Sequence, residues 1–518
     1  MNRLSILALL LTLSLVGGAT VRAQAPSSPE LSRARYQTIS SHLDTGGDLM
    51  IVANVGGVVD QLVETVRSFA SLAQGPHAGH NPAQTALDHL PAYVKSSGIN
   101  AIDGLGLSLV PRSDGLNDIK LFICREPAAA NLPLWRATVG GAPQRLLAPE
   151  YLPADTVIAR VGTGEPQQLW KLVTDAVQQM GGPQALLAFN QTVASAVTPA
   201  LGTNLETVVA SLGNEAFISL QLSTNQTMNV PLPNAGKNGD EAGLTIPLPS
   251  LLIGIAVRDD TLSTALQHLL TNQKAPVICS QAGATTLYSI NVPAPMPMPF
   301  SPTFAVQKGL FLLGSTPDVV KAAIAAAEGQ GGLGHTPAYQ KAFAGLPAMN
   351  NGLAYIDPRF YETLTQVQTR LLATSAPDAD ASGLLRLLRR NEHGLVAIVF
   401  VNEKAGVAVS GTTSAGGREI ALTMSVAPVA MLSAIAIPSF MKSRQVAQQS
   451  SCINNLRIID HAKEQWALAN NKNEGDAVTM ADIQPYLKQV PVCPQGGKYT
   501  LGAIGTEPTC SHAGHVLP

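Results

Sequence analysis

A unit made of one β-strand, a short turn and one amphipathic helix recurs four times along this 518-residue sequence. In each copy an apolar strand is followed within a few residues by a helix whose apolar side chains repeat every three or four positions. The copies begin at Asp48, Asp155, Leu251 and Gly352, about 100 residues apart. This period is too long for a tight solenoid, so we expect paired structural repeats within one α+β assembly.

Hairpin-like segments lie between these copies. In one of them, two short apolar runs at residues 303–306 and 310–313 flank a tight turn. A helix should follow it, capped by Ser315 or Thr316 and beginning at Pro317. Strands and helices in this alternation predict antiparallel sheets with helices on one face.

The repeated units divide the chain into regions. We place a first α+β repeat region at residues 24–230 and a second at 250–427. The polar segment 223–247 is rich in Asn, Gly and Pro, which predicts a long exposed loop between them. A separate C-terminal domain is expected at residues 429–518.

Charge content limits the functions open to this chain. Charged residues make up 13% of the sequence, about half of the usual share, and the formal net charge is −2. The sequence has no basic stripe with interleaved aromatic residues, which argues against nucleic-acid binding. Aromatic residues are only 4% of the chain, so small apolar side chains must fill most of the interior.

The first 23 residues have the pattern of a secretory signal peptide. Arg3 supplies a positive charge, residues 4–16 form a short apolar core, and Ala23 is a small residue at the expected cleavage point. The alternative is an uncleaved anchor, for which the apolar core is short. Either interpretation predicts an exported protein, in the periplasm or at the cell surface, in which cysteines can oxidise.

Common catalytic signatures are missing from the sequence. It contains neither a Gly-x-Ser-x-Gly elbow nor a His-Glu-x-x-His motif. His77 and His80 share a loop without further ligands nearby in sequence. Cys510, His512 and His515 are more closely spaced, with Cys493 as a further ligand if it lies close in space, but a disulfide would consume these thiolates. We interpret the histidines as surface residues and expect no metal, no cofactor and no enzymatic activity.

The C-terminal region carries the pattern of a known family. An apolar run with Pro438 precedes a helix whose buried stripe steps by three and four residues, and a short capped turn at Thr479 follows. A Pro-x-Cys-Pro-x-Gly-Gly-x-Tyr segment and a terminal hairpin close the chain. The stripe consists of Cys452, Leu456, Ile459, Ala462, Trp466 and Ala469. This region resembles the soluble part of type II secretion pseudopilins and type IV pilins.

The resemblance has consequences for individual residues. It implies a helix kinked at Pro438, and Cys493 and Cys510 are expected to form a disulfide that closes the terminal hairpin, stabilising it by about 3 kcal/mol. Cys452 is then most simply a buried free thiol, and the partners of Cys124 and Cys279 stay open. The sequence before Pro438 does not match the site at which pilins are cleaved during processing.

Residues 420–441 carry no charge and allow two interpretations. They could span a membrane. Alternating apolar residues up to Val426, followed by Pro428, instead divide the segment into a strand and a shorter apolar helix, the interpretation we favour. Membrane contact through this segment remains open.

The N-terminal part also resembles a family, that of large exported bacterial proteins of unknown function. The matching residues are 152–155, Leu-Pro-Ala-Asp, and the hairpin-to-helix step at 309–320. This resemblance implies a fold class and no activity. We therefore expect an exported, non-enzymatic structural or interaction protein, with secretion or pilus components as partners. A ligand-binding module and a hydrolase with an unrecognised site are the alternatives.

Overall fold

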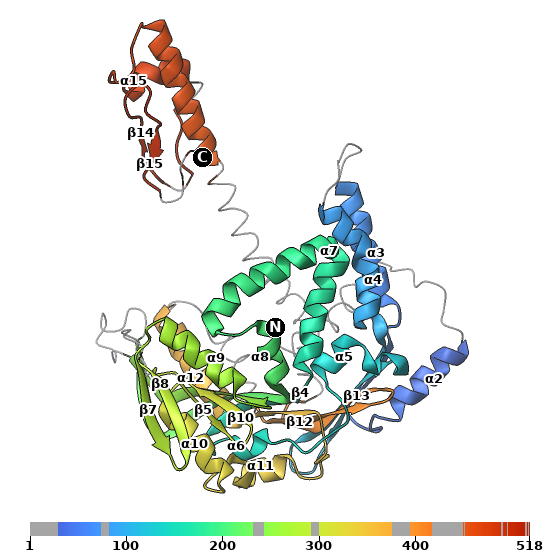
Figure 1. The fold of residues 1–518 in the computed structure, drawn as a ribbon. Coiled ribbons are helices and arrows are strands. Elements are labelled where there is room, and N and C mark those ends of the chain that lie inside the picture. The colour runs from blue at the N-terminus through green and yellow to red at the C-terminus, as the bar shows by residue number, and fades with distance from the viewer. Residues whose placement is uncertain are drawn as a thin grey trace. The chain divides into compact units, whose positions relative to one another are not determined.

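Thirteen strands form one antiparallel sheet in the computed structural model of the chain (Figure 1). The structure describes residues 29–73, 82–231, 243–291, 300–375, 394–416, 449, 451–487, 490–494, 496–512, 515 and 517. Described residues up to 416 form one compact unit, the sheet unit, and those from 449 onward form a second, the C-terminal unit. The mixed α+β class and the antiparallel pairing are confirmed.

The sheet is assembled from four meanders, each made of strands consecutive in sequence. Its order is β1-β2-β3, then β13-β12-β11, then β4-β5-β6, then β10-β9-β8-β7, so every second meander runs backwards through the sheet. The strands are β1 (Leu49–Asn54), β2 (Ile102–Pro111), β3 (Asn117–Arg125), β4 (Thr156–Thr163), β5 (Leu212–Pro231), β6 (Gly243–Val257), β7 (Val277–Ala282), β8 (Thr285–Ile290), β9 (Thr303–Gln307), β10 (Leu310–Gly314), β11 (Gly352–Ile356), β12 (Val396–Glu403) and β13 (Gly406–Thr413). The expected repeat regions, 24–230 and 250–427, therefore contribute strands to a single sheet.

Each recurring strand leads into a helix, as the sequence pattern predicts. The pairs are β1 with α3 (Val58–Ala73), β4 with α7 (Pro166–Leu201), β6 with α9 (Thr261–Asn272) and β11 with α12 (Pro358–Ser375). The long helix α7 is broken at Gly182, which has a non-helical φ of 79° and is followed by Pro183. The other helices of this unit are α2 (Pro29–Ser40), α4 (Pro82–Ser97), α5 (Pro133–Thr138), α6 (Ala148–Tyr151), α8 (Leu205–Ser211), α10 (Pro317–Ala327) and α11 (Pro337–Ala342).

Helices lie on both sides of the sheet, so the expectation of a single covered face was wrong. In Figure 1, α7, α8 and α9 lie on one side and α6, α10 and α11 on the other. The cause is visible in β9 and β10, whose residues are buried almost without interruption instead of alternating. A strand buried on both faces needs cover on both faces.

The turn and cap before α10 are confirmed in detail. Lys308 and Gly309, with φ of 48° and 76°, make the tight turn between β9 and β10. The Thr316 hydroxyl accepts a hydrogen bond from the Val319 amide at the start of α10, and Pro317 is the first helical residue. Ser315, the alternative cap, is hydrogen-bonded to Leu251 of β6 instead.

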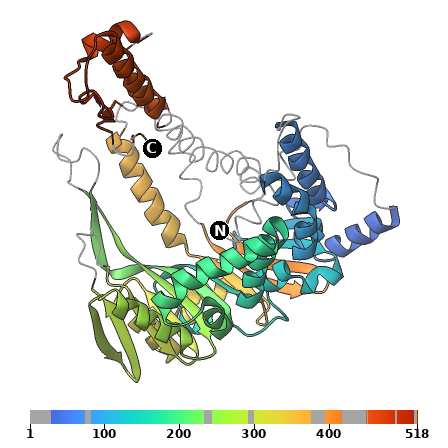
Figure 2. The ribbon, with the colours of Figure 1, turned by 45° about the horizontal axis from the view of Figure 1, so that its top comes forward.

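The polar segment 223–247 is not a single exposed loop. β5 continues to Pro231 and β6 begins at Gly243, and residues 227–231 pair with residues 243–247 after a register shift between Leu222 and Thr227. Figure 2 shows them, in green, continuing as a long two-stranded arm. Asn, Gly and Pro suggested a loop, but the two strands shift register between Leu222 and Thr227 and then resume pairing.

The main hydrophobic core lies where α6 and α10 pack on the central strands. Phe304 of β9 does not belong to this cluster but is also fully buried, with its ring centroid 5.0 Å from that of Tyr288 and 5.8 Å from that of Phe311. In the main core, Phe217 of β5 lies opposite Gly254 of β6, and a side chain at position 254 would meet the Phe217 ring at 2.0 Å.

Glu215 is a buried carboxylate that holds the start of α6. Its two oxygens accept hydrogen bonds from the amides of Ala148, at 2.6 Å, and Leu147, at 3.0 Å. Burial nevertheless raises the pKa of this carboxyl above its ordinary value, because the loss of water outweighs the effect of these donors.

A pH dependence follows from Glu215. Because the folded chain holds this proton more tightly than the unfolded chain, the group stabilises the fold most below pH 4.5, and that contribution is lost as the pH rises through the raised pKa. Melting followed by circular dichroism should therefore show the wild type losing stability relative to Glu215→Gln as the pH rises toward neutrality. If the wild type instead became more stable relative to Glu215→Gln over this pH range, the two amide donors would outweigh burial in setting the pKa of Glu215.

The C-terminal unit consists of a helix, a capped turn and a small hairpin. The helix covers residues 451–469, and α15 (Met480–Ile483) continues as a 3-10 turn, η4 (Gln484–Tyr486). Two short strands, β14 (Tyr499–Thr500) and β15 (Thr509–Cys510), pair antiparallel. Thr479 and Asp482 form the expected capping box.

One face of the 451–469 helix is buried, as the sequence stripe predicts. Cys452, Leu456 and Ile459 are completely buried, but at the far end Ala467 is buried in place of Ala469. The predictions for the signal peptide with Ala23, for His77 and His80, for Pro438 and for segment 420–441 fall outside the described residues. Within the described part of the chain, the structure contains no helix with both the length and the apolar character needed to span a membrane.

Candidate metal centre

Four side chains from four separate segments meet at one end of the C-terminal unit. They are Cys452 on the helix, Cys493 in the segment before the hairpin, Cys510 in β15, and His515 beyond it. Their ligand atoms all lie within 4.8 Å of one another. Cys452, Cys493 and His515 are buried, and Cys510 is half-buried.

Local sequence explains why the two hairpin cysteines approach each other. Gly496 has a φ of 76° and donates its amide hydrogen to the Cys493 carbonyl at 3.0 Å, which turns the chain directly after this cysteine. A side chain at Gly497 would lie 2.5 Å from the Cys510 sulfur and 3.2 Å from the Cys493 sulfur. The Gly-Gly pair thus lets the backbone pass against both sulfurs.

Hydrogen-bond donors surround the sulfur atoms. The Tyr499 hydroxyl donates to the Cys452 sulfur at 3.3 Å, and the His512 amide donates to the Cys510 sulfur at 3.4 Å. Asn455 donates to the Tyr499 oxygen at 3.1 Å, which orients the phenol hydrogen toward Cys452. The arrangement supplies the outer partners that sulfur ligands of metal sites have.

Electrostatics in the bare cluster favour neutral groups. Burial, together with the neighbouring thiols of Cys493 and Cys510, raises the pKa of the Cys452 thiol to about 12. Burial lowers the pKa of His515, as does the neighbouring His512 ring, which stacks on it at a centroid distance of 4.4 Å. A bound divalent cation would reverse this preference for the thiols by stabilising the thiolates.

Sequence reasoning recovered only part of this cluster. It placed Cys493 near Cys510 and His515, but it assigned Cys452 to a free thiol and considered His512 as a ligand. In the structure His512 lies outside the set. Cys452 was missed because it is about 40 residues before Cys493, on a helix stripe where a cysteine resembles an ordinary core residue.

The predicted disulfide between Cys493 and Cys510 is not formed in the structure. In the part of the chain that the structure describes, no disulfide joins any of the five cysteines. Cys124 and Cys279 belong to β3 and β7 of the sheet unit. Three sulfurs and one imidazole nitrogen lie close enough together to bind one metal ion, whereas the sequence pattern led us to expect no metal here.

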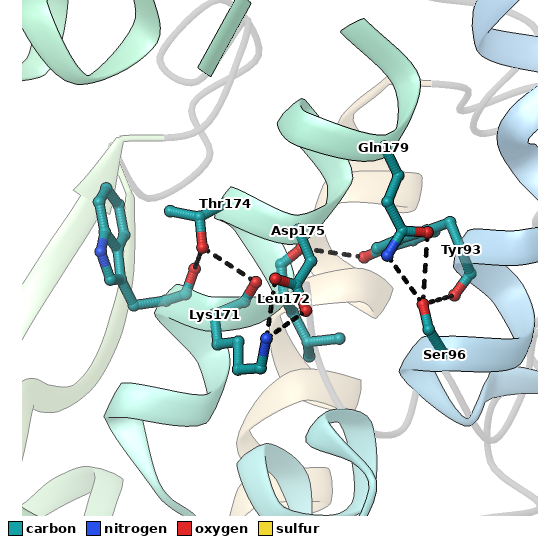
Figure 3. A network of polar contacts seen from close by, with 8 residues as sticks. Tyr93, Ser96, Lys171, Leu172, Thr174, Asp175 and Gln179 are labelled. Atoms are coloured by element: carbon teal, nitrogen blue, oxygen red, sulfur yellow. Dashed lines mark hydrogen bonds and ion pairs between the residues drawn. The ribbon is translucent and has the colours of Figure 1, made fainter. Parts of the chain in front are cut away.

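A second polar network joins two helices of the sheet unit and has a different character. Figure 3 shows Tyr93 of α4 donating to the Leu172 carbonyl of α7 at 3.2 Å, while Ser96 and Gln179 bond across the same helix pair. Burial and the charge of Asp175 raise the pKa of Tyr93. These contacts pack α4 against α7, and we assign them a structural role.

A buried lysine ties the 451–469 helix to the hairpin. Lys463 is almost fully buried, and its ammonium group donates to the carbonyls of Leu501, at 2.7 Å, and Thr506. Burial lowers the pKa of this lysine. Its hydrogen bonds thus fix the loop between β14 and β15 on the helix.

Replacing Lys463 with methionine should destabilise the C-terminal unit by about 1–2 kcal/mol, because two charge-assisted hydrogen bonds are lost while the apolar stem is kept. Hydrogen exchange of residues 499–510 should become faster by about tenfold, the factor to which 1.4 kcal/mol corresponds. Lys472→Met, at an exposed lysine of the same unit, is the matched control and should change exchange little. Equal exchange in both variants would show that the Lys463 bonds contribute nothing.

No protein-family model matches this chain, and neither a curated protein nor a solved structure matches it.

Proposed function

We propose that this chain is an exported, non-enzymatic structural or interaction protein whose C-terminal unit acts as a pseudopilin-like module. The observation that carries the proposal is the closed character of the candidate metal centre. All four positions of a tetrahedral site are supplied by protein side chains, whereas catalytic sites of this kind keep one position for water or substrate.

The C-terminal unit supports the same proposal. A helix with one buried face packs on a capped turn and a short hairpin, and this order of elements is the one that the resemblance to pseudopilins implies. Such a small unit offers a rigid helix and hairpin for contact with another protein. In this proposal the sheet unit is the body that the module accompanies, and secretion or pilus components are its partners.

Export is tested by the N-terminus of the mature chain. Protein recovered from the cell envelope of a producing bacterium should begin at Gln24, as determined by mass spectrometry of the N-terminal peptide. Protease added to cells with a permeabilised outer membrane should digest the C-terminal unit. A chain that keeps residues 1–23 and stays in the cytosol would contradict export.

The module is tested by deletion. Full-length chain and a variant lacking residues 429–518 should both be exported, but in-cell crosslinking should join only the full-length chain to a pilin-type or secretion component. Equal crosslinking of both chains would place the contact in the sheet unit and contradict the proposal. A turnover abolished by one substitution would contradict the non-enzymatic assignment.

A further inference from the structure

We propose that Cys452, Cys493, Cys510 and His515 bind one Zn²⁺ ion, and that this ion holds the C-terminal unit together. The proposal concerns the chemistry of this unit alone. It stands whether or not the chain is exported or contacts a secretion assembly. It rests on the geometry of the four side chains and on what surrounds them.

The geometry suits a tetrahedral zinc ion. Zinc–sulfur bonds of about 2.3 Å and zinc–nitrogen bonds of about 2.0 Å place neighbouring sulfur and nitrogen ligands about 3.6 Å apart, and two sulfurs about 3.8 Å apart. In the structure the Cys493 sulfur lies 3.6 Å from Nδ1 of His515. All four ligand atoms lie within 4.8 Å of one another, so a contraction of no more than about 1 Å completes the tetrahedron.

The choice of ligands points to zinc more than to harder metals. Thiolate and imidazole ligands in tetrahedral arrangement are typical of zinc, whereas magnesium and calcium take oxygen ligands. The four described ligand atoms include no carboxylate. Three cysteines with one histidine is one of the ordinary compositions of structural zinc sites.

A disulfide explains the cluster less completely. It would join two sulfurs at about 2.05 Å and would leave the third cysteine and the histidine packed against it without a role. Zinc uses all four side chains. The donors from Tyr499 and from the His512 amide also point at sulfur, and a thiolate bound to zinc is a better acceptor than a disulfide.

The unit also needs the stabilisation that a metal provides. Among its described residues, the hydrophobic cluster of this unit contains three buried residues, Ile459, Ala462 and Ile483, with partly buried neighbours around them. Small domains of this kind often depend on metals or disulfides because their cores bury too little apolar surface. Zinc here would link the beginning of the helix to both sides of the hairpin and to the residues that follow it.

Zinc binding is tested on the full-length mature chain, purified under reducing conditions. One zinc ion per chain is expected by elemental analysis, and Co²⁺ titrated into the metal-free chain should produce thiolate-to-metal charge-transfer absorption and intense visible bands of a tetrahedral site. Cys452→Ser and His515→Asn should each weaken Co²⁺ binding by more than about 100-fold, since loss of an outer partner alone costs about 10- to 100-fold.

Matched controls separate ligands from neighbours. Cys279→Ser removes an exposed cysteine of the sheet unit, and His512→Asn removes the ring stacked on His515; both should bind Co²⁺ as the wild type does. Tyr499→Phe keeps all four ligands but removes a donor to Cys452, and it should weaken binding by about tenfold. Retained binding in Cys452→Ser and His515→Asn would overturn the ligand assignment.

One measurement avoids variants, which could fail to fold. X-ray absorption at the zinc edge of the wild-type protein should show three sulfur and one nitrogen neighbours. A shell made of nitrogen and oxygen alone would overturn the proposal. So would a reduced chain that takes up no zinc and, after air oxidation, carries a Cys493–Cys510 disulfide in mass spectrometry.

Discussion

Replacing Phe304 with alanine should lower the free energy of unfolding of the sheet unit by about 3–5 kcal/mol. The Phe304 side chain is fully buried in β9, between the rings of Tyr288 and Phe311. Alanine would leave a cavity, because β9 is hydrogen-bonded to β8 and β10 on its two sides and cannot move inward to fill it. Urea unfolding followed by circular dichroism measures the loss.

Phe300→Ala is the matched control for this experiment. Phe300 is the same residue type four positions earlier, but 39% of it is exposed, so its removal should cost less than about 1 kcal/mol. A Phe304→Ala variant no less stable than Phe300→Ala would show that the core around β9 is looser than the structure indicates.

Introducing valine at Gly254 should lower the free energy of unfolding by about 3 kcal/mol. The Phe217 ring covers Gly254 from the neighbouring strand, and any β-carbon at position 254 would lie 2.0 Å from that ring. Since Phe217 is itself buried, its ring has little space into which it can rotate. Chemical denaturation of the purified variant measures this cost.

A second substitution tests the cause. Phe217→Ala alone should destabilise by about 3–5 kcal/mol, but combined with Gly254→Val it should cost less than the sum of the two changes, because the valine then occupies vacated space. Gly334→Val is the control, since a β-carbon there meets no atom within 4 Å. Additive losses in the double variant would show that the two residues do not compete for the same volume.

Local chemistry explains which features were predictable from the sequence. The starts of α10 and α12 follow from neighbouring residues alone: Thr316 with Pro317, and Asp357, whose carboxylate accepts from the Arg359 amide at 3.0 Å. The four strand–helix units could be predicted for the same reason, because the periodicity of a strand or a helix depends only on residues close in sequence.

Long-range pairing was beyond this kind of reasoning. Nothing in the residues of β3 specifies β13 as its neighbour, and the arm formed by β5 and β6 was mistaken for a loop because its polar residues resemble turn signals. The metal cluster was missed likewise. Its hairpin part has a recognisable spacing, but Cys452 joins it only through the packing of the 451–469 helix.

The order of the strands also determines when the sheet can be completed. β3 pairs with β13 as well as with β2, and β4 pairs with β11 as well as with β5. Residues near 120 and 160 therefore acquire their second neighbouring strand only after residues near 410 and 355 are available. Contacts this distant in sequence slow folding, since a long loop must close before they form. Until then β3 exposes an unpaired backbone edge, along which another chain can add a strand. When the chain is synthesised or exported with its N-terminus first, it should therefore depend on holdase chaperones until β13 has emerged.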